Sequence, residues 1–320
     1  MLRASLIAIV IAGCMPDAVD DDDTGDEVPT PLTSSVIKHV FVIAMENHGA
    51  SSIYGNTTSA PYIQSLLASY GRATNFIDKL PTLPSEPHYV WMEAGTNAFS
   101  DHTFTTDNNP SSTNSTSSKQ HLTTQIKTAG STWFSYQEGI NTTTGACPIK
   151  GSGNYAPKHD PMVFFQDVVG ATPSKTNAYC VAHHKALTAL ATDLANNKVA
   201  AYNFITPNLC HDMHSNSCAG SSDPIKQGDD WLAANVPAII SYVNGHQGVL
   251  MIVWDEPEGS TGTIPLIVIG PNVRANHAST VQLSHSSLVK SVEEILELPQ
   301  LATVKSSNDL ADFFTAGSFP

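Results

Sequence analysis

Residues 248–256 read Gly-Val-Leu-Met-Ile-Val-Trp-Asp-Glu, so an unbroken apolar run leads directly into two carboxylates. A second run, at residues 39–47, reads His-Val-Phe-Val-Ile-Ala-Met-Glu-Asn. Such runs are typical of strands buried on both faces, as in a parallel sheet. Ligands of open α/β sheets bind beyond the carboxyl ends of the strands. The two runs therefore predict one site for a hard cation, formed by Glu46, Asn47, Asp255 and Glu256.

Strand-like and helix-like segments alternate along the rest of the chain. Strands are expected at residues 36–45, 132–137, 199–205, 248–254 and 264–269, and helices at 60–71, 120–129, 160–169, 183–196, 231–243 and 284–298. Asp160 is expected to cap the third of these helices, with Pro161 in its first turn. The alternation predicts a three-layer α/β/α sandwich with a mainly parallel central sheet.

The N-terminus has the features of an export signal. Arg3 is followed by a short, mostly apolar stretch from Ala4 to Ala12 and then by Gly13-Cys14. The stretch is too short to span a membrane. Ile11-Ala12-Gly13-Cys14 resembles the bacterial lipobox, which implies a signal peptide at 1–13 and a lipid on Cys14; an ordinary signal peptide with an incidental cysteine is the alternative. The chain is then exported, either secreted or anchored to a bacterial membrane by lipid.

An acidic segment follows the signal. Seven of residues 17–27 are acidic, and they supply half of the net charge of −14. We expect residues 14–35 to be a disordered linker, although a Ca²⁺-binding strip is an alternative. The catalytic domain would then span residues 36–298, and residues 299–320 would form a loosely packed C-terminal tail. No cluster of basic residues points to nucleic acid as a partner.

The cysteines indicate two disulfides. If Cys14 carries lipid, four of the five cysteines remain, an even number that suits an exported protein. Cys210 and Cys218 would close a short loop, which leaves Cys147 to pair with Cys180. Zinc ligation is the alternative, but the chain has no Cys-x-x-Cys motif.

Six short polar motifs interrupt the apolar pattern, and several directly follow predicted strands. They are Met45-Glu-Asn-His48, Leu83-Pro-Ser-Glu-Pro-His-Tyr89, Lys158-His-Asp-Pro161, Pro207-Asn-Leu-Cys-His-Asp-Met-His214, Trp254-Asp-Glu-Pro257 and Ser284-His-Ser-Ser287. In order and spacing they resemble the bacterial and fungal phosphoesterase family of acid phosphatases and phospholipases C, within the alkaline-phosphatase superfamily. The resemblance covers roughly residues 36–298 and implies an alkaline-phosphatase-like fold.

The resemblance implies a serine nucleophile and a divalent metal. Ser85 would attack phosphorus and form a phosphoserine, and Gly95 follows ten residues later, as in related enzymes. The alternative is that Ser85 only belongs to a Pro-Ser-Glu-Pro turn. Glu46, Asn47, Asp255 and Glu256 would bind the metal together with Ser85. Oxygen ligands favour Mg²⁺, Ca²⁺ or Mn²⁺, although Zn²⁺ also accepts carboxylates.

Further polar residues match the family's motifs. Asp212 and His214 would bind a second cation, or His214 would protonate the leaving oxygen. His159 would contact the phosphate or the leaving group; alternatively it enters a helix and bonds to backbone. His88 stands where the family often has Asn and could replace it if suitably oriented or protonated. His285 is either a distant ligand or a loop residue, and His211 is assigned to a surface loop.

These features predict a metal-dependent phosphomonoesterase that acts on a small phosphate ester. One alternative is a phosphodiesterase such as phospholipase C, disfavoured because Pro257-Glu-Gly-Ser-Thr-Gly replaces the family's Gly-Gly-Phe segment after Asp-Glu. Another is an inactive, anchored surface-binding protein, which the departures at His88, His211 and Ser286 permit. The sequence does not determine the metal, the natural substrate or the oligomeric state.

Overall fold

The computed structural model describes residues 1, 37–140, 145–215, 218, 221–257, 259 and 262–320. Apart from Met1, the predicted signal peptide lies outside the described residues, and so do the lipid on Cys14 and the whole acidic linker. From Ile37 onward the described residues belong to one compact unit. Within the described part of the chain, no helix is long and apolar enough to cross a membrane.

The described residues form one sheet of eight strands, in the order β4-β3-β5-β1-β6-β7-β2-β8. Neighbouring strands are parallel except that β7 runs antiparallel to both β6 and β2. The strands are β1 (His39–Met45), β2 (Gly71–Ala73), β3 (Trp133–Gln137), β4 (His184–Ala186), β5 (Tyr202–Thr206), β6 (Gly248–Trp254), β7 (Leu266–Ile269) and β8 (Ala278–Ser279).

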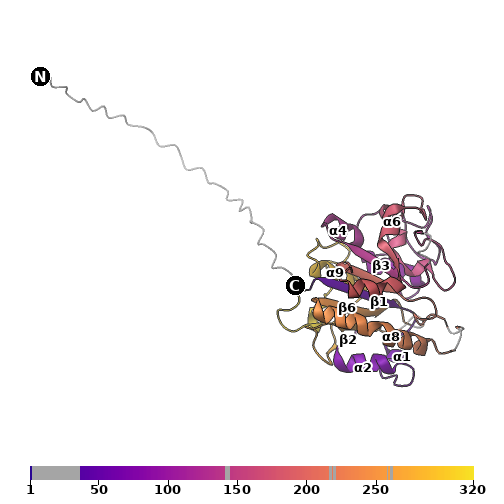
Figure 1. Cartoon of the computed structure of the whole chain (residues 1–320), viewed down its shortest axis with the longest axis vertical. Coiled ribbons are helices and arrows are strands. Elements are labelled where there is room, and N and C mark those ends of the chain that lie inside the picture. Colours follow the sequence, from indigo (N-terminus) through magenta and orange to yellow (C-terminus); the bar gives the residue numbers. More distant parts are fainter. Residues whose placement is uncertain (2–36, 141–144, 216–217, 219–220, 258, 260–261) are drawn as a thin grey trace. The chain divides into compact units, whose positions relative to one another are not determined.

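Helices cover both faces of this sheet. The α-helices are α1 (Ala50–Ile53), α2 (Pro61–Ser69), α3 (Ser85–Ala94), α4 (Leu122–Thr128), α5 (Gln166–Val169), α6 (Ala178–His183), α7 (Leu190–Ala195), α8 (Pro224–Gly245) and α9 (His285–Ile295). Figure 1 shows α2 and α8 on one side of β1 and β6, and α4 and α9 on the other. The predicted α/β/α sandwich with a mainly parallel sheet is therefore confirmed.

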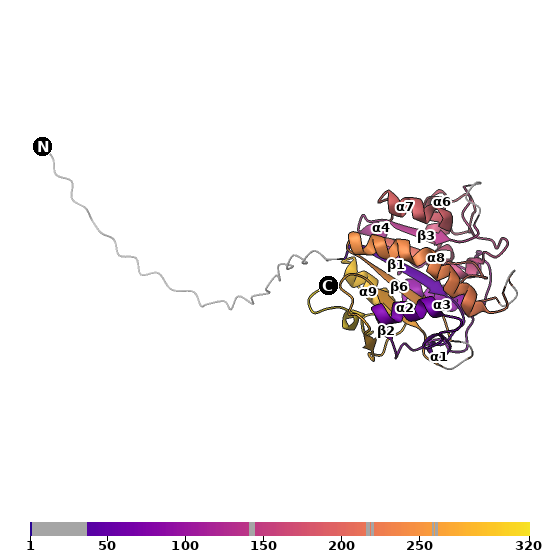
Figure 2. The same ribbon diagram turned by 60° about the horizontal axis from the view of Figure 1, so that its bottom comes forward.

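The two quoted apolar runs are adjacent central strands. β1 and β6 pair in parallel register, with Met45 opposite Trp254, and they lie side by side in both views (Figure 1, Figure 2). All seven residues of β6 are buried, and so are the last six of β1. In that register Glu46 and Asp255 emerge together at the carboxyl edge of the sheet.

Two predicted helices differ from the structure. The segment 183–196 contains a break, because α6 ends at His183 and His184–Ala186 form β4, which pairs with β3; α7 begins only at Leu190. Pairing with a distant strand overrides the local helical pattern here. The segment 160–169 is a 3₁₀ turn, η2 (Pro161–Phe164), followed by α5.

Asp160 does not cap the helix it precedes. It occupies the N-cap position of η2, but its side chain makes no capping hydrogen bond. Instead its carboxylate accepts hydrogen bonds from the Ser135 and Tyr155 hydroxyls and lies 3.2 Å from His184 Nε2. Buried donors on neighbouring segments therefore compete successfully for this carboxylate.

The segment after α9 is better packed than its sequence indicates. Leu301, Val304, Leu310 and Phe313 are all buried. A Cβ atom added to Gly71 would lie only 2.6 Å from Phe313 Cδ1, so the glycine in β2 makes room for this ring. The C-terminal residues thus belong to the core.

Both predicted disulfides are present, Cys147–Cys180 and Cys210–Cys218. The alternative of zinc ligation by these cysteines is therefore wrong. The second disulfide closes the loop that contains Asp212 and His214.

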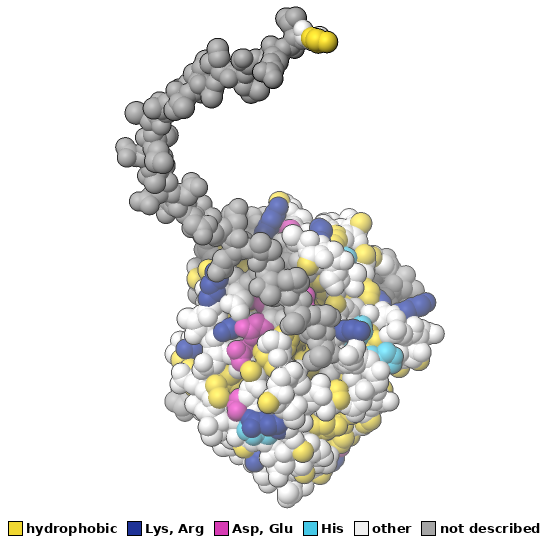
Figure 3. Space-filling view, turned by 90° about the vertical axis from the view of Figure 1, so that its left-hand side faces the viewer, with side chains coloured by type: hydrophobic (Ala, Val, Ile, Leu, Met, Phe, Trp, Pro, Cys, Tyr) yellow, Lys and Arg dark blue, Asp and Glu magenta, His cyan; other side chains and the backbone are white. Residues whose placement is uncertain are grey.

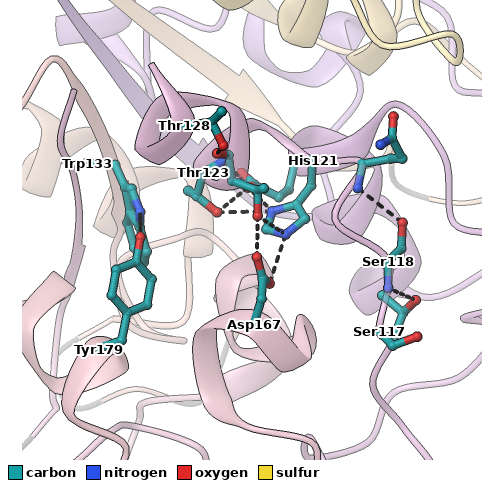
Figure 4. Close-up of polar contacts among 12 residues, drawn as sticks. Ser117, Ser118, His121, Thr123, Thr128, Trp133, Asp167 and Tyr179 are labelled. Carbon is teal, nitrogen blue, oxygen red and sulfur yellow. Dashed lines mark hydrogen bonds and ion pairs between the residues drawn. The ribbon is translucent and has the colours of Figure 1, made fainter. Parts of the chain in front are cut away.

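A buried ion-pair cluster holds the far end of α3. His121 Nδ1 lies 2.9 Å from Glu93 Oε1 of α3, and His121 Nε2 lies 3.0 Å from Asp167 Oδ1 of α5. Figure 4 shows the ring between Thr123 and Asp167. Burial alone would lower the pKa of His121, but the hydrogen bonds to Asp167 and Glu93 outweigh it and raise that pKa. Both ring nitrogens face carboxylates, and this arrangement favours the protonated form of His121.

Basic side chains do not gather on the surface drawn in Figure 3. Lys and Arg residues lie singly or in small groups among polar side chains on that face.

Candidate active site

Ser85 begins helix α3 and lies against the carboxylate that follows β1. Its side chain is only 3 % exposed, and its hydroxyl donates a hydrogen bond to Glu46 Oε2 at 3.1 Å. Pro84 is the N-cap residue of α3, so the Pro-Ser-Glu-Pro motif forms the entry and first turn of a helix. The motif therefore begins a helix and is not an isolated turn, and Ser85 has a carboxylate beside it; its role as a nucleophile stays a prediction.

Two fully buried carboxylates meet at the carboxyl edge of the sheet. Asp255 Oδ1 accepts the backbone N–H of Asn47 at 3.0 Å, which fixes the orientation of the carboxylate. Asn47 reaches this position in the left-handed region, at φ 54°. Among the described residues, Asp255 Oδ2 and Glu46 Oε1 are buried without a hydrogen-bond partner. Buried anionic oxygens without partners are costly, so this donor set fits a hard cation.

The protonation of these carboxylates reflects their crowding. Burial, followed by repulsion from Asp255 and Asp212, raises the pKa of Glu46 well above its usual value. Burial and then Asp255 raise the pKa of Glu256 to about 8. Asp255 is also raised in pKa, mainly by burial. A divalent cation would favour the ionised form of each group, because it replaces lost solvation with a direct charge interaction.

Asp212 orients a second part of the site. Its Oδ1 accepts the His214 backbone N–H at 2.8 Å, and its Oδ2 lies 3.1 Å from His159 Nδ1. The opposite nitrogen, His159 Nε2, lies 3.1 Å from Glu46 Oε1, but without hydrogen-bond geometry. Burial, then Lys158 and His214, lowers the pKa of His159 well below its usual value. A neutral Nε2 and a carboxylate oxygen at this distance can share a proton or a cation.

Two groups of side chains have ligand atoms close enough for a cation. One consists of Glu46, His159 and His214, and the other of His88, Asp255 and Glu256; within each group the atoms lie within 4.8 Å of one another. Among the described residues, the predicted acidic ligands are thus divided between the two groups, with Glu46 beside His159 and His214, and with Asp255 and Glu256 beside His88.

His88 is held as a cation. Its Nδ1 lies 2.8 Å from the Pro84 carbonyl oxygen and its Nε2 lies 3.0 Å from Asp78 Oδ1, so both nitrogens face acceptors. Burial opposes the charge, but the hydrogen bond to Asp78 and the nearby Asp255 raise the pKa of His88 to about 9. This geometry suits a positive charge beside the site better than a metal ligand.

His285 and His211 have other contacts. His285 Nε2 lies 3.0 Å from the Trp254 carbonyl oxygen, and the buried ring packs edge-on against Phe76. Burial and then His88 lower the pKa of His285 to about 4. The buried His285 ring therefore packs beside the His88 ring. His211 pairs with Glu138 at 2.9 Å, in line with its assignment to a loop.

A bridge of two ionic side chains lies next to Ser85 and is not predicted from the sequence. Asp107 Oδ1 accepts the Glu86 backbone N–H at 3.0 Å, and Asp107 Oδ2 accepts from Lys158 Nζ at 2.6 Å. The bridge joins the first turn of α3 to η1 (Pro157–His159), so it connects the neighbours of Ser85 and His159. Lys158 stood in a recognised motif, but no pattern marks Asp107 in its polar loop.

A cavity of about 600 Å³ borders the site. Its lining residues include Asn47, His214 and Glu256, together with Pro81, Leu83, Pro84, Met213, Pro224 and Pro257. This volume is within the usual range of about 300–1,000 Å³ for small-molecule sites.

Comparison with known proteins identifies the family. The model of the Phosphoesterase family matches residues 59–299. The chain is 27% identical over 277 residues to "Phosphatidylinositol-3-phosphatase" of Mycobacterium tuberculosis, covering 86% of this chain and 82% of that protein. It is 26% identical over 287 residues to "Probable acid phosphatase" of Kluyveromyces lactis, with 86% of this chain but only 62% of that protein covered.

Solved structures share the fold at low identity. A protein in the alkaline phosphatase superfamily from Vibrio parahaemolyticus matches with a TM-score of 0.53 at 10% identity, covering 88% of this chain and 72% of that one. Phosphonate monoester hydrolase from Silicibacter pomeroyi matches with a TM-score of 0.53 at 11% identity, covering 87% and 76%. The chain therefore belongs to the Phosphoesterase family and has the fold of the alkaline-phosphatase superfamily.

Proposed function

We propose that the protein is a metal-dependent phosphomonoesterase that works through a phosphoserine on Ser85. The observation that carries the proposal is the hydrogen bond from the buried Ser85 hydroxyl to Glu46, beside buried carboxylate oxygens that have no hydrogen-bond partner among the described residues. Glu46, Asn47, Asp255 and Glu256 would hold a divalent cation together with Ser85. Bound there, the cation supplies positive charge that stabilises the phosphoryl oxygens and the ionised serine oxygen.

The residues of the chain suggest the order of events. Glu46 accepts the Ser85 proton as the serine oxygen forms a bond to phosphorus and the bond to the leaving oxygen breaks. His214 borders the cavity and is placed to give the leaving oxygen its proton, and Asp212 holds the His214 backbone. His88 adds positive charge near the phosphoryl group. Water then cleaves the serine–phosphorus bond and releases phosphate.

We also propose that the protein is exported. Two disulfides are compatible with an exported protein, because they persist in oxidising compartments. Lipid attachment at Cys14 stays a prediction.

The Ser85→Ala variant tests the mechanism. We expect turnover of p-nitrophenyl phosphate to fall about a thousandfold or more, with binding of the divalent cation largely kept. EDTA should abolish wild-type turnover, and one of Mg²⁺, Ca²⁺, Mn²⁺ or Zn²⁺ should restore it. Ser51→Ala, an exposed serine in α1, is the matched control.

Three results would change the assignment. Near-normal turnover by Ser85→Ala would rule out this nucleophile. Turnover of bis(p-nitrophenyl) phosphate without turnover of the monoester would favour the phosphodiesterase. No turnover of either ester with any of the four cations would leave a binding protein.

A further inference from the structure

Six of the twelve residues that line the cavity near Ser85 are apolar, and the others include Asn47, His48, Thr82, His214 and Glu256. Pro81, Leu83 and Pro84 form one wall, and Met213, Pro224 and Pro257 come from three other segments. Pro84 directly precedes Ser85, and Asn47 directly follows Glu46, which accepts the Ser85 hydrogen bond. Residues next in sequence to Glu46 and Ser85 therefore line the cavity, which provides space near the serine for the group that leaves from phosphorus.

The segments that line the cavity contain no Lys or Arg. Neither residue type occurs in residues 39–71, 80–118, 199–225 and 247–273. These ranges include the positions near the cavity that lie outside the described residues. Lys79 and Lys226 stand just outside these segments and do not line the cavity, and Lys226 pairs with Asp230 at 2.8 Å. An anionic leaving group would therefore find no Lys or Arg on these walls, where the basic side chains among the described residues are His48 and His214.

The cations nearest the site are already paired. Lys158 Nζ lies 2.6 Å from Asp107, and the His88 ring lies 3.0 Å from Asp78. The acidic side chains of the site outnumber these two cations: they are Glu46, Asp212, Asp255 and Glu256, of which the first three are fully buried. A divalent cation would balance part of this charge, but the transferred phosphoryl group is itself anionic, so a second anion on the substrate would meet net repulsion.

We propose that this cavity binds the leaving group of the substrate and selects an uncharged, partly apolar phenol or alcohol. The same walls disfavour leaving groups that carry further phosphate, sulfonate or carboxylate. The inference rests on the proposed function, because it assigns the substrate class of the same site. The proposal makes Leu83 a specificity-determining residue. Leu83 is half-buried, lines the cavity and directly precedes Pro84, the N-cap residue of α3.

The test compares two esters that share a naphthalene ring, 1-naphthyl phosphate and the same ester with a sulfonate on the ring. We expect the wild-type kcat/KM to be about tenfold or more lower for the sulfonated ester, because the added charge has no partner in the cavity. Leu83→Lys should raise kcat/KM for the sulfonated ester and lower it for the naphthyl ester, so that the ratio shifts at least about tenfold.

Two further variants keep the test decisive. Leu187→Lys introduces the same change at a half-buried leucine that lines a different cavity, and it should leave the ratio unchanged. Leu83→Ala removes apolar contact without adding charge, so it should lower kcat/KM for the naphthyl ester; this variant also replaces Leu83→Lys if the lysine prevents folding.

The possible failures are distinguishable. If the wild type hydrolyses neither ester, the proposed function fails. If it hydrolyses both with equal kcat/KM, and the Leu83 variants leave the ratio unchanged, only the assignment of this cavity is overturned.

Discussion

At the scale of single residues, the two oxygens of one carboxylate can have different roles in the candidate site. In Asp255 the two oxygens have different tasks, because Oδ1 is fixed by the Asn47 N–H while Oδ2 is buried without a described partner. An amide at this position can keep the first interaction, but it carries no negative charge for a cation. The two contributions can therefore be separated by substitution.

Asp255→Asn should weaken binding of the activating divalent cation about a hundredfold or more while the fold is retained. The reason is that a hard cation loses an anionic ligand in a buried setting. Titration calorimetry with the metal-free protein measures the affinity, and melting temperature reports on the fold. Asp230→Asn is the control, because Asp230 is exposed on α8 and pairs with Lys226. Equal cation affinity in the wild type and Asp255→Asn would exclude Asp255 as a ligand.

At the scale of elements, the position of Ser85 depends on how α3 begins. Its N-cap residue, Pro84, makes no side-chain capping bond. Asp107, from a distant loop, instead accepts the Glu86 N–H and joins this turn to Lys158. The bridge therefore sets the spacing between the first turn of α3 and the segment that carries His159.

Asp107→Asn should lower kcat about tenfold while the affinity for the divalent cation stays unchanged. The amide still offers an oxygen to Glu86 but no longer attracts Lys158. Lys158→Met should have a similar effect, and the double variant should lose no more than either single variant, because both remove one interaction. Asp101→Asn, in the same loop, is the control; Asp101 accepts from Thr116 and Ser117. Additive losses would show that the two residues act independently.

Elements that local patterns define were predicted correctly, and those that depend on distant partners were not. β1 and β6 are continuous apolar runs, so their ends located Glu46 and Asp255. In contrast, β4 exists because His184 pairs with Ser135 of β3, which no local pattern in 183–196 indicates. The prolines at 84 and 87 resembled a turn and hid the start of α3. Asp107 acts through space in a polar loop without periodicity.

At the scale of the whole molecule, stability should depend on pH through His121. Its pKa is raised, so the stabilisation is fully present below about pH 6.5, the usual imidazole value, and is lost as pH rises through the raised pKa. Burial works against the charge of Asp167, but its hydrogen bond with His121 lowers the pKa of Asp167. That contribution is present above about pH 3.9 and is lost as pH falls through the lowered pKa.

His121→Gln should reduce the free energy of unfolding by about 3–5 kcal/mol, because Glu93 would stay buried without its cation. The loss should be largest between about pH 4 and 6.5 and should shrink toward alkaline pH. Urea denaturation across this range measures it. His246→Gln is the control, since His246 is exposed and bonds the Tyr242 carbonyl oxygen. A loss that is the same at every pH would contradict an ion pair.

The place of β1 in the sheet also determines when the chain can fold. Val40 pairs with Tyr202 of β5 on one side and with Val249 of β6 on the other. The ribosome therefore synthesises β1 before either of the strands with which it pairs. Contacts so distant along the chain slow folding. Until β6 leaves the ribosome, one edge of β1 has no neighbour, and its apolar residues remain open to association with other chains. Synthesis that stops before residue 248 thus yields an aggregation-prone fragment rather than a smaller domain.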